Sequence, residues 1–245
     1  MYREKVGIIG GFGAYATLNF YKRLLEEFAS ESERNYPHII MDNNFTMPSR
    51  TRALLYGEAY DEVVDGISDS IQLMMQNDVS KIILVCGTAH YFLNDVYKKI
   101  PEAKEKIVDI INIINIMGEE LKLKDEGEVL VIAAEGALQK KLYQTRLKKY
   151  GIKCVNPDEE DFIDIRYFIE CVKRNELNED LVHQFGNFLD KFGKRNVVLG
   201  CTEFPVLVEY IDKCQKTEST VNLRKQYCFY DPLQMTIKWL KENLQ

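Results

Sequence analysis

The sequence has no long run of apolar residues. A helix that spans a membrane needs about 18 or more such residues in succession, and no stretch approaches this length. The opening segment "MYREKVGIIGG" contains too short an apolar run for a secretory signal and leads directly into a predicted strand. We therefore expect a cytoplasmic protein.

An excess of basic residues is also absent. The chain has 32 Lys and Arg against 38 Asp and Glu, and its formal net charge is −6. Surfaces that bind nucleic acid normally carry a clear basic excess, so the composition argues against a nucleic-acid partner. The remaining composition is that of an ordinary globular protein, with 46% apolar and 29% charged residues over 245 positions.

Histidine is scarce, and the cysteines are not arranged in pairs. The three histidines are far apart, and none of the six cysteines belongs to a Cys-x-x-Cys motif. Structural zinc sites use closely spaced ligand pairs, so no metal is expected. Disulfides are not expected in a reducing compartment, and most of the cysteines are interpreted as small buried apolar side chains.

Short apolar runs alternate with amphipathic segments along the whole chain. The runs are continuous rather than alternating, which is typical of parallel strands covered on both faces. The predicted strands are 5–10, 38–41, 81–86, 106–111, 128–134, 153–155, 196–200 and 227–230. Segment 58–77 predicts a helix, because its apolar residues recur at i, i+3 and i+4 spacing.

Repeated strand–helix units predict an α/β fold with mainly parallel sheets flanked by helices. The polar segment 94–106, which contains Pro101, separates two comparable sets of units. We expect two similar domains, one formed by residues 1–100 with 212–245 and the other by residues 101–211. A single wide sheet is the structural alternative.

A glycine-rich turn, "GIIGGFGAYAT", follows the first predicted strand. Gly11, Gly13 and Ala16 fit the G-x-G-x-x-A form of a dinucleotide-binding turn, which would make the protein a nicotinamide-dependent oxidoreductase. The acid that binds ribose should follow about 20 residues on, and Asp42 lies later than that. The other interpretation is a turn whose backbone amides face a carboxylate or phosphate.

The loop after the second predicted strand, "MDNNFTMPSRTR", contains two arginines. Loops at the carboxyl ends of parallel strands bind ligands in such sheets. Arg50 or Arg52 could hold a carboxylate through a bidentate guanidinium contact.

Two distant segments share one layout. "KIILVCGTAHYF" (81–92) and "NVVLGCTEFPVL" (196–207) each consist of an apolar strand, a cysteine, a nearby threonine and a predicted helix start. Cys86 and Cys201 therefore lie where a strand ends and a helix begins, and helix amides at such a place favour a thiolate. One cysteine from each half could flank a small molecule.

Several motifs resemble the cofactor-independent aspartate/glutamate racemases, in particular the aspartate racemase branch. "GIIGGFGAYAT" is similar to that branch's GGMGPxAT start, "MPSRT" to its IPDRT loop, "CGTAHYF" to its CNTAHYF, and "GCTEFPVL" to its GCTELPLL. Weaker similarities are "EGALQKKLYQ", "PDEED" and "YDPLQ". The motifs occur in order over nearly the whole chain.

The resemblance implies two pseudo-symmetric α/β domains with the active site in the cleft between them, and a homodimer. It also implies racemisation of aspartate or glutamate without a cofactor. Cys86 and Cys201 would then be the two catalytic groups, one removing the α-proton and the other donating a proton to the opposite face. Such an inversion needs one ionised and one protonated group on opposite sides of one carbon.

The resemblance further assigns substrate contacts. Gly11 and Gly87 lie in the matching motifs, and Thr88 and Thr202 with nearby amides would hold the α-carboxylate. Arg50 would bind the side-chain carboxylate.

Three further side chains are given roles by the same resemblance. A second cation is expected in the helix after "PDEED", for which Arg166 is the candidate. Glu203 would orient Cys201 or meet the substrate ammonium, or would simply be an acid at a helix start. His90 is expected to have a structural role.

Two positions depart from the branch pattern: Gly87 replaces an asparagine and Ser49 replaces an aspartate. Neither change touches the cysteines, but both bear on substrate choice. A non-catalytic binder on a racemase scaffold is therefore a further alternative, beside the oxidoreductase.

Overall fold

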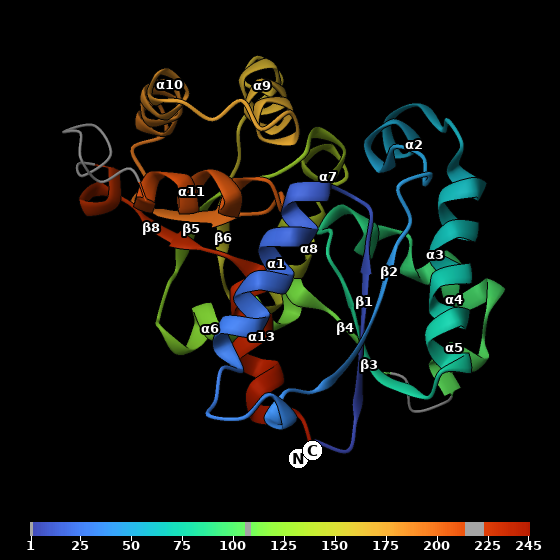
Figure 1. Ribbon diagram of the computed structural model, residues 1–245. Helices are drawn as coiled ribbons and strands as arrows, with labels where there is room; N and C mark the ends of the chain where they lie inside the picture. The colour runs from blue at the N-terminus through green and yellow to red at the C-terminus, as the bar shows by residue number, and fades with distance from the viewer. Residues whose placement is uncertain (1, 106–108, 214–222) are drawn as a thin grey trace. The chain divides into compact units, whose positions relative to one another are not determined.

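The computed structural model describes residues 2–105, 109–213 and 223–245. The chain divides into two compact units. Unit 1 consists of Met1–Ile113 and Leu233–Gln245, and unit 2 consists of Ile114–Pro232. Figure 1 shows the elements of both units along the chain.

Unit 1 contains a parallel sheet of four strands in the order β2-β1-β3-β4. The strands are β1 (Lys5–Gly10), β2 (His38–Asn43), β3 (Val79–Leu84) and β4 (Asp109–Ile111). β1 is buried from Val6 to Gly10 and β3 from Ile82 to Leu84, as the continuous apolar runs require.

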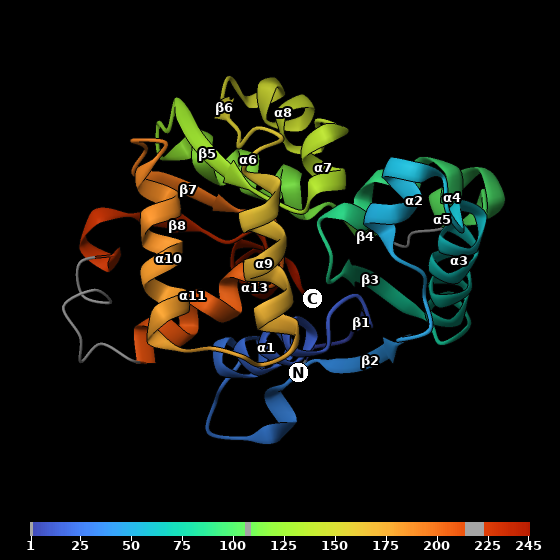
Figure 2. The same cartoon turned by 90° about the horizontal axis from the view of Figure 1, so that it is seen from above.

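Helices cover both faces of this sheet. In Figures 1 and 2, α1 (Ala14–Glu27) and α13 (Pro232–Asn243) lie on one face, and α3 (Tyr60–Gln76) lies on the other. The remaining helices are α2 (Arg50–Tyr56), α4 (Leu93–Lys99) and α5 (Glu102–Glu105), with short 3-10 turns at η1 (Glu33–Asn35) and η2 (Thr88–Tyr91). The apolar positions that predicted the helix over 58–77 are buried in α3: Val63, Val64, Ile67, Ile71 and Met74.

Unit 2 repeats the arrangement, with a parallel sheet in the order β6-β5-β7-β8. Its strands are β5 (Glu128–Ile132), β6 (Lys153–Val155), β7 (Asn196–Leu199) and β8 (Cys228–Tyr230). Its helices are α6 (Ile113–Leu123), α7 (Glu135–Gln139), α8 (Leu142–Leu147), α9 (Phe162–Lys173), α10 (Glu179–Asp190) and α11 (Phe204–Lys213), with the 3-10 turn η3 (Lys148–Tyr150). In each sheet, the strand that comes first in the chain lies between the second and the third.

An aromatic cluster joins three helices of unit 2. The Phe168 ring of α9 lies 5.4 Å from Phe185 and 5.5 Å from Phe188, both on α10. Phe185 in turn stacks at 5.8 Å on Phe204, the first residue of α11. Because these rings are fully or almost fully buried, they fix α9 beside the start of α11.

The structure confirms the α/β class and the eight strand positions, with shifts of bounds. β3 begins and ends two residues earlier than predicted, and β4 is described from Asp109, so positions 106–108 of the predicted strand lie outside the described residues. Segment 94–105 forms α4 and α5, and Val96, Ile100 and Ala103 are buried in the core of unit 1.

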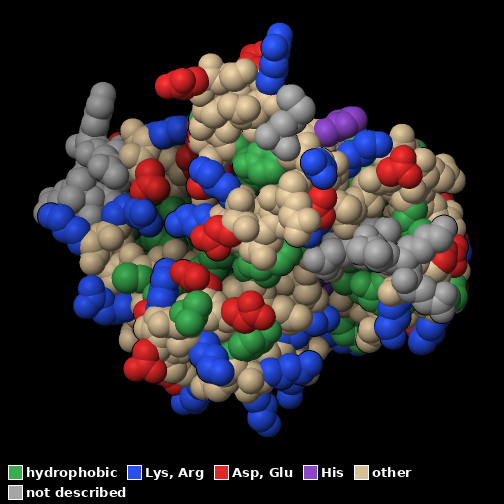
Figure 3. Space-filling view, turned by 90° about the horizontal axis from the view of Figure 1, so that it is seen from below, with side chains coloured by type: hydrophobic (Ala, Val, Ile, Leu, Met, Phe, Trp, Pro, Cys, Tyr) green, Lys and Arg blue, Asp and Glu red, His purple; other side chains and the backbone are tan. Residues whose placement is uncertain are grey.

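The surface carries both signs of charge. On the face drawn in Figure 3, Lys and Arg side chains are interspersed with Asp and Glu. Across the described parts of the chain, no helix has both the length and the apolar character that crossing a bilayer would need.

Candidate active site

The two candidate cysteines occupy equivalent places in the two sheets. Cys86 lies just beyond Leu84, where β3 ends, and Cys201 lies just beyond Leu199, where β7 ends. β3 and β7 hold the same position in the strand order of their sheets. Both cysteines therefore lie at the carboxyl ends of parallel strands, where α/β sheets place their ligands.

The backbone around Cys86 is held by hydrogen bonds to neighbouring strands. The amide of Val85 donates to the carbonyl of Ile9 at 2.9 Å, which extends the sheet beyond the end of β3. Nδ1 of the buried His90 lies 2.9 Å from the carbonyl oxygen of Cys86, and its Nε2 lies 3.3 Å from that of Ile111. His90 thus joins the Cys86 turn to β4, which agrees with the structural role expected for it.

The segment after Cys86 differs from the predicted helix start. A 3-10 turn, Thr88–Tyr91, comes first, and α4 begins only at Leu93. Gly87 has φ −58° and ψ −44°, a conformation that any residue adopts. Thr88, which follows Gly87 in the chain, is buried. The helix start predicted directly after Cys86 is therefore a 3-10 turn.

The backbone before Cys201 is fixed by close packing. The Gly200 amide donates to Ile132 at 2.7 Å, and the buried hydroxyl of Tyr143 donates to the Gly200 carbonyl at 2.6 Å. A Cβ at Gly200 would lie 2.8 Å from the Cβ of Ala133, so only glycine fits without a shift.

The Cys201 side chain contacts a buried carboxylate. Its Sγ donates a hydrogen bond to Oε2 of Glu203 at 2.9 Å, and Glu203 is only 4% exposed. The hydroxyl of Thr202, which is also buried, lies 3.5 Å from the same oxygen. Glu203 directly precedes the first residue of α11 and accepts backbone hydrogen bonds from the first turn of that helix.

Lys173, at the end of α9, interacts with the same group, although the sequence analysis did not single it out. Its ammonium donates to Glu170 at 2.9 Å. Desolvation would lower the pKa of Lys173, but the hydrogen bond to Glu170 and the negative charges of Glu203 and Cys201 raise it above its ordinary value. Lys173 is therefore a cation within electrostatic reach of Cys201.

Arg166, the predicted second cation, lies two turns before Lys173 on α9. Its guanidinium donates to Oε2 of Glu135, the first residue of α7, at 2.8 Å, and its side chain is 62% exposed. The seven-residue separation puts Arg166 and Lys173 on one face of the helix. That spacing was the signal in the sequence that could have identified Lys173.

Arg50 is positioned by backbone oxygens and an aromatic ring. Its Nη1 donates to the carbonyl of Pro48 at 2.8 Å and its Nη2 to that of Phe12 at 2.7 Å. The guanidinium carbon lies 4.9 Å from the centre of the Phe12 ring. Nε is buried without a hydrogen-bond partner, and within the described residues no carboxylate pairs with this arginine. α2, which begins at Arg50, also contacts the 3-10 turn after Cys86.

Arg52, the other candidate in this loop, has a carboxylate partner. Its Nε donates to Glu58 at 2.6 Å and its Nη2 donates to the same carboxylate at 2.8 Å. Of the two loop arginines, Arg50 is therefore the one whose charge is available to a ligand.

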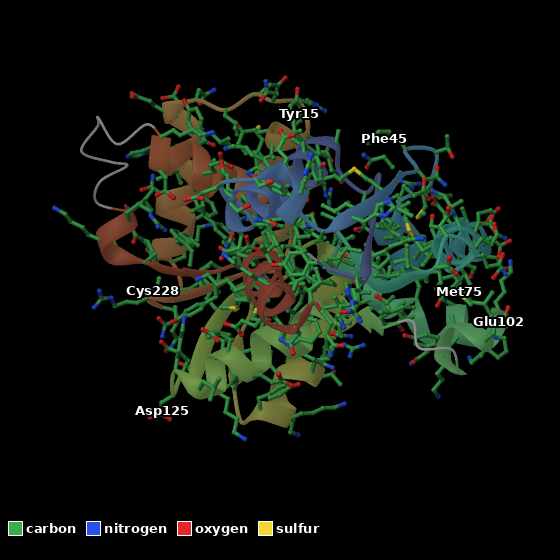
Figure 4. The ribbon with its side chains drawn as sticks, turned by 60° about the horizontal axis from the view of Figure 1, so that its bottom comes forward. Tyr15, Phe45, Met75, Glu102, Asp125 and Cys228 are labelled. Carbon is green, nitrogen blue, oxygen red and sulfur yellow. The ribbon has the colours of Figure 1, made fainter. Side chains whose placement is uncertain are left out.

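The glycine-rich turn after β1 is explained by its neighbour in the sheet. Gly11 has φ +81°, and a Cβ there would lie 2.3 Å from the backbone oxygen of Asn44, in the loop after β2. Gly13 precedes α1, and Ala16 is buried. The glycine at position 11 is therefore required by loop packing and does not need a dinucleotide to account for it. Figure 4 shows Tyr15, just after this turn, and Phe45, in the loop after β2, extending outward.

Metal ligands are not grouped in the described residues. No set of three or more His, Cys, Asp or Glu side chains there is arranged to hold an ion.

Comparison with protein families accounts for most of the chain. The sequence profile described as Asp/Glu/hydantoin racemase matches residues 9–222, a range that includes both cysteines and all the strands except β1, which it enters part-way, and β8. The chain belongs to this family.

Individual relatives are distant. The chain is 25% identical over 167 residues to a glutamate racemase of Clostridium perfringens, and 24% identical over 157 residues to a broad specificity amino-acid racemase of Bacillus subtilis. The first alignment covers 64% of this chain and 59% of the glutamate racemase, so it spans less than two thirds of that protein.

A solved structure extends the fold comparison over the whole chain. The aspartate racemase of Picrophilus torridus superposes with a TM-score of 0.77 at 23% identity, covering 99% of this chain and 96% of the other. The family's two-domain α/β fold is therefore the fold of this protein.

Proposed function

We propose that this protein racemises an acidic amino acid, aspartate or glutamate, with Cys86 and Cys201 as its two acid–base groups. The observation that carries the proposal is the placement of the two cysteines beyond equivalent strands of two sheets with the same order. Membership of a family described by aspartate, glutamate and hydantoin racemases supports the reaction class.

The proposed reaction moves one proton at each face of the α-carbon. The thiolate of one cysteine takes the α-proton, so that a C–H bond breaks and an S–H bond forms. The thiol of the other cysteine then gives its proton to the opposite face and becomes the thiolate. The cycle balances in protons and electrons and needs no redox partner, but it requires the two sulfurs to reach opposite faces of one carbon.

The substrate class follows from two cations. No carboxylate among the described residues pairs with Arg50 of unit 1, and Lys173 of unit 2, which donates to Glu170, interacts electrostatically with Cys201 and Glu203. An acidic amino acid carries two carboxylates, which matches two cations, and charge-assisted hydrogen bonds of this kind are among the stronger polar contacts in proteins. A hydantoin has no carboxylate to use them.

The first test replaces the cysteines one at a time. Cys86→Ser and Cys201→Ser should each abolish formation of the D-form from the L-form, measured by chiral chromatography. Cys228→Ser, which changes the exposed cysteine on β8, is the matched control and should keep full activity. Near wild-type activity in either of the first two variants would contradict the two-cysteine mechanism.

The second test identifies the substrate. The protein is incubated in D2O with L-aspartate, L-glutamate, L-alanine or a 5-substituted hydantoin, and exchange at the α-carbon is followed by NMR. We expect exchange with one or both acidic amino acids and not with alanine or the hydantoin. Exchange with the hydantoin alone would indicate that the protein racemises hydantoins instead of amino acids. An absence of exchange with all four compounds would favour a non-catalytic binder.

Two further predictions remain: a homodimer, which the resemblance implies, and a cytoplasmic location, which the apolar pattern of the sequence led us to expect. Light scattering coupled to size exclusion tests the first.

A further inference from the structure

We propose that Phe12 is a positioning residue for Arg50. Its aromatic ring and its backbone carbonyl fix the guanidinium, so that the remaining N–H groups bind one carboxylate of the substrate. This inference rests on the proposed function, in which the substrate is an acidic amino acid. It deepens that function because it names a residue on which the affinity for the carboxylate depends.

The guanidinium of Arg50 is held by the turn after β1 and by its own loop. Nη1 donates to the carbonyl of Pro48 at 2.8 Å, and Nη2 donates to the carbonyl of Phe12 at 2.7 Å. The guanidinium carbon lies 4.9 Å from the centre of the Phe12 ring, within the distance at which an aromatic face attracts a cation. Because Phe12 is only 5% exposed, the packing around its ring keeps it in place.

The N–H groups that remain on Arg50 match one carboxylate. A guanidinium has five N–H groups, one on Nε and two on each Nη. The two carbonyls each accept one N–H, from different Nη atoms, and Nε is buried without a hydrogen-bond partner. One N–H therefore remains on each Nη, and a pair of N–H···O bonds is the usual contact of an arginine with a carboxylate.

The groups that hold Arg50 carry no charge. Both acceptors are backbone carbonyls, and the ring belongs to a phenylalanine. Ser49 stands where the IPDRT motif has an aspartate, and its hydroxyl accepts a hydrogen bond from the Arg52 amide at the start of α2. Neutral partners orient the guanidinium without neutralising it, so its charge is kept for a ligand.

The ring is a departure of this chain from the aspartate racemase motif. That motif, GGMGPxAT, has methionine at the position of Phe12. The backbone before the ring is fixed, because Gly11 has φ +81° and a Cβ there would collide with the backbone of Asn44. A thioether has no aromatic face, so the cation–π contact comes from this chain's own sequence.

Titration calorimetry of the intact protein with succinate measures carboxylate binding without turnover. Succinate has the two carboxylates of aspartate but no ammonium group. Phe12→Leu removes the ring and keeps the backbone carbonyl, and it should weaken succinate binding about three- to tenfold, as expected for the loss of one cation–π contact. Phe12→Met should weaken it similarly. Unchanged binding in both variants, or no succinate binding by the wild type, would overturn the inference.

Two further variants separate positioning from general packing. Phe28→Leu changes another buried ring in the same way, at the opposite end of α1, and should leave succinate binding unchanged. Arg50→Lys removes the planar guanidinium, so Phe12→Leu should weaken binding little further in the Arg50→Lys background. Additive effects of Phe12→Leu and Arg50→Lys, or an equal loss of binding in Phe28→Leu, would overturn the inference.

Steady-state kinetics links the contact to the reaction. Phe12→Leu should raise KM for the acidic amino acid by the same factor as for succinate and change kcat little, because this carboxylate is bound alike before and during the proton transfer. A fall in kcat with an unchanged KM would overturn the inference. Failure of the proposed function is recognised separately: activity in Cys86→Ser or Cys201→Ser would remove the two-cysteine mechanism, whereas the succinate titration needs no turnover.

Discussion

Two cysteines that look alike in the sequence have different surroundings in the structure. Each follows an apolar strand and is close to a threonine, and this repeated layout is what made Cys86 and Cys201 recognisable. The sequence could not show that Glu203 turns back toward the Cys201 sulfur or that His90 turns toward a carbonyl. Those contacts depend on side-chain rotamers and on packing between distant segments, which local patterns do not encode.

The choice between Arg166 and Lys173 is a matter of partners. Arg166 pairs with Glu135 and is largely exposed, whereas Lys173 pairs with Glu170 and also interacts electrostatically with Cys201 and Glu203. Lys173→Met should raise KM for the acidic substrate about tenfold or more, because one charge-assisted hydrogen bond contributes about 1.5–3 kcal/mol. Arg166→Met is the matched control on the same helix face and should change KM much less. Steady-state kinetics measures both KM values. A larger increase in KM for Arg166→Met than for Lys173→Met would make Arg166 the second cation.

At the scale of elements, the turn between β1 and α1 contacts the loop after β2, which leads to Arg50. Gly11 contacts the backbone of Asn44, and the carbonyl of Phe12 accepts a hydrogen bond from Arg50. The strands on either side could be predicted because they are continuous apolar runs. The contact between their loops could not, since it depends on the parallel pairing of β1 with β2.

Alanine substitutions at two glycines allow the effect of backbone strain on the free energy of unfolding to be measured apart from that of a steric clash. Gly11 and Gly57 both have positive φ, at +81° and +71°, but a Cβ at Gly57 would meet nothing within 4 Å. Gly57→Ala should therefore lower the free energy of unfolding by about 1 kcal/mol, from strain alone. Gly11→Ala adds a collision with Asn44 and should cost about 2–4 kcal/mol. Urea denaturation of both variants measures the difference, and equal costs would mean that the Asn44 loop moves freely.

Helix boundaries were harder to predict than strands. The segment 94–105 is polar and contains Pro101, which favours a linker, but Val96, Ile100 and Ala103 are buried against the core of unit 1. Three apolar residues at helical spacing are enough to anchor two short helices when tertiary packing supports them. The aromatic cluster of unit 2 also depends on tertiary packing, because its rings come from three successive helices, α9, α10 and α11.

At the scale of the whole molecule, one strand order occurs twice. The order β2-β1-β3-β4 of unit 1 corresponds to β6-β5-β7-β8 of unit 2, and both sheets are parallel. The class of fold was predictable because strand–helix repetition restricts the topology to a few right-handed forms. β4 and β8 have three residues each, and an apolar run this short is barely enough to predict a strand.

The last helix stabilises a unit that is distant from it in sequence. Thr236, Ile237 and Leu240 of α13 are completely buried, and the Gln245 carbonyl accepts hydrogen bonds from the amides of Arg3 and Glu4. Truncation after Pro232 should therefore increase amide hydrogen exchange in β1 to β4, while β5 to β7 keep their protection. Exchange followed by mass spectrometry tests this. Equal loss of protection in both sheets would show that the units unfold together.

The course of the chain has a mechanical consequence. Unit 2 is an uninterrupted stretch, Ile114–Pro232, inserted between the two segments that form unit 1. A force applied at Arg3 and Gln245 is therefore carried first by the hydrogen bonds from the Arg3 and Glu4 amides to Gln245, because no tension reaches the inserted stretch while these bonds hold. Unit 1 therefore bears the load first, and unit 2 bears it only after these contacts of unit 1 have broken.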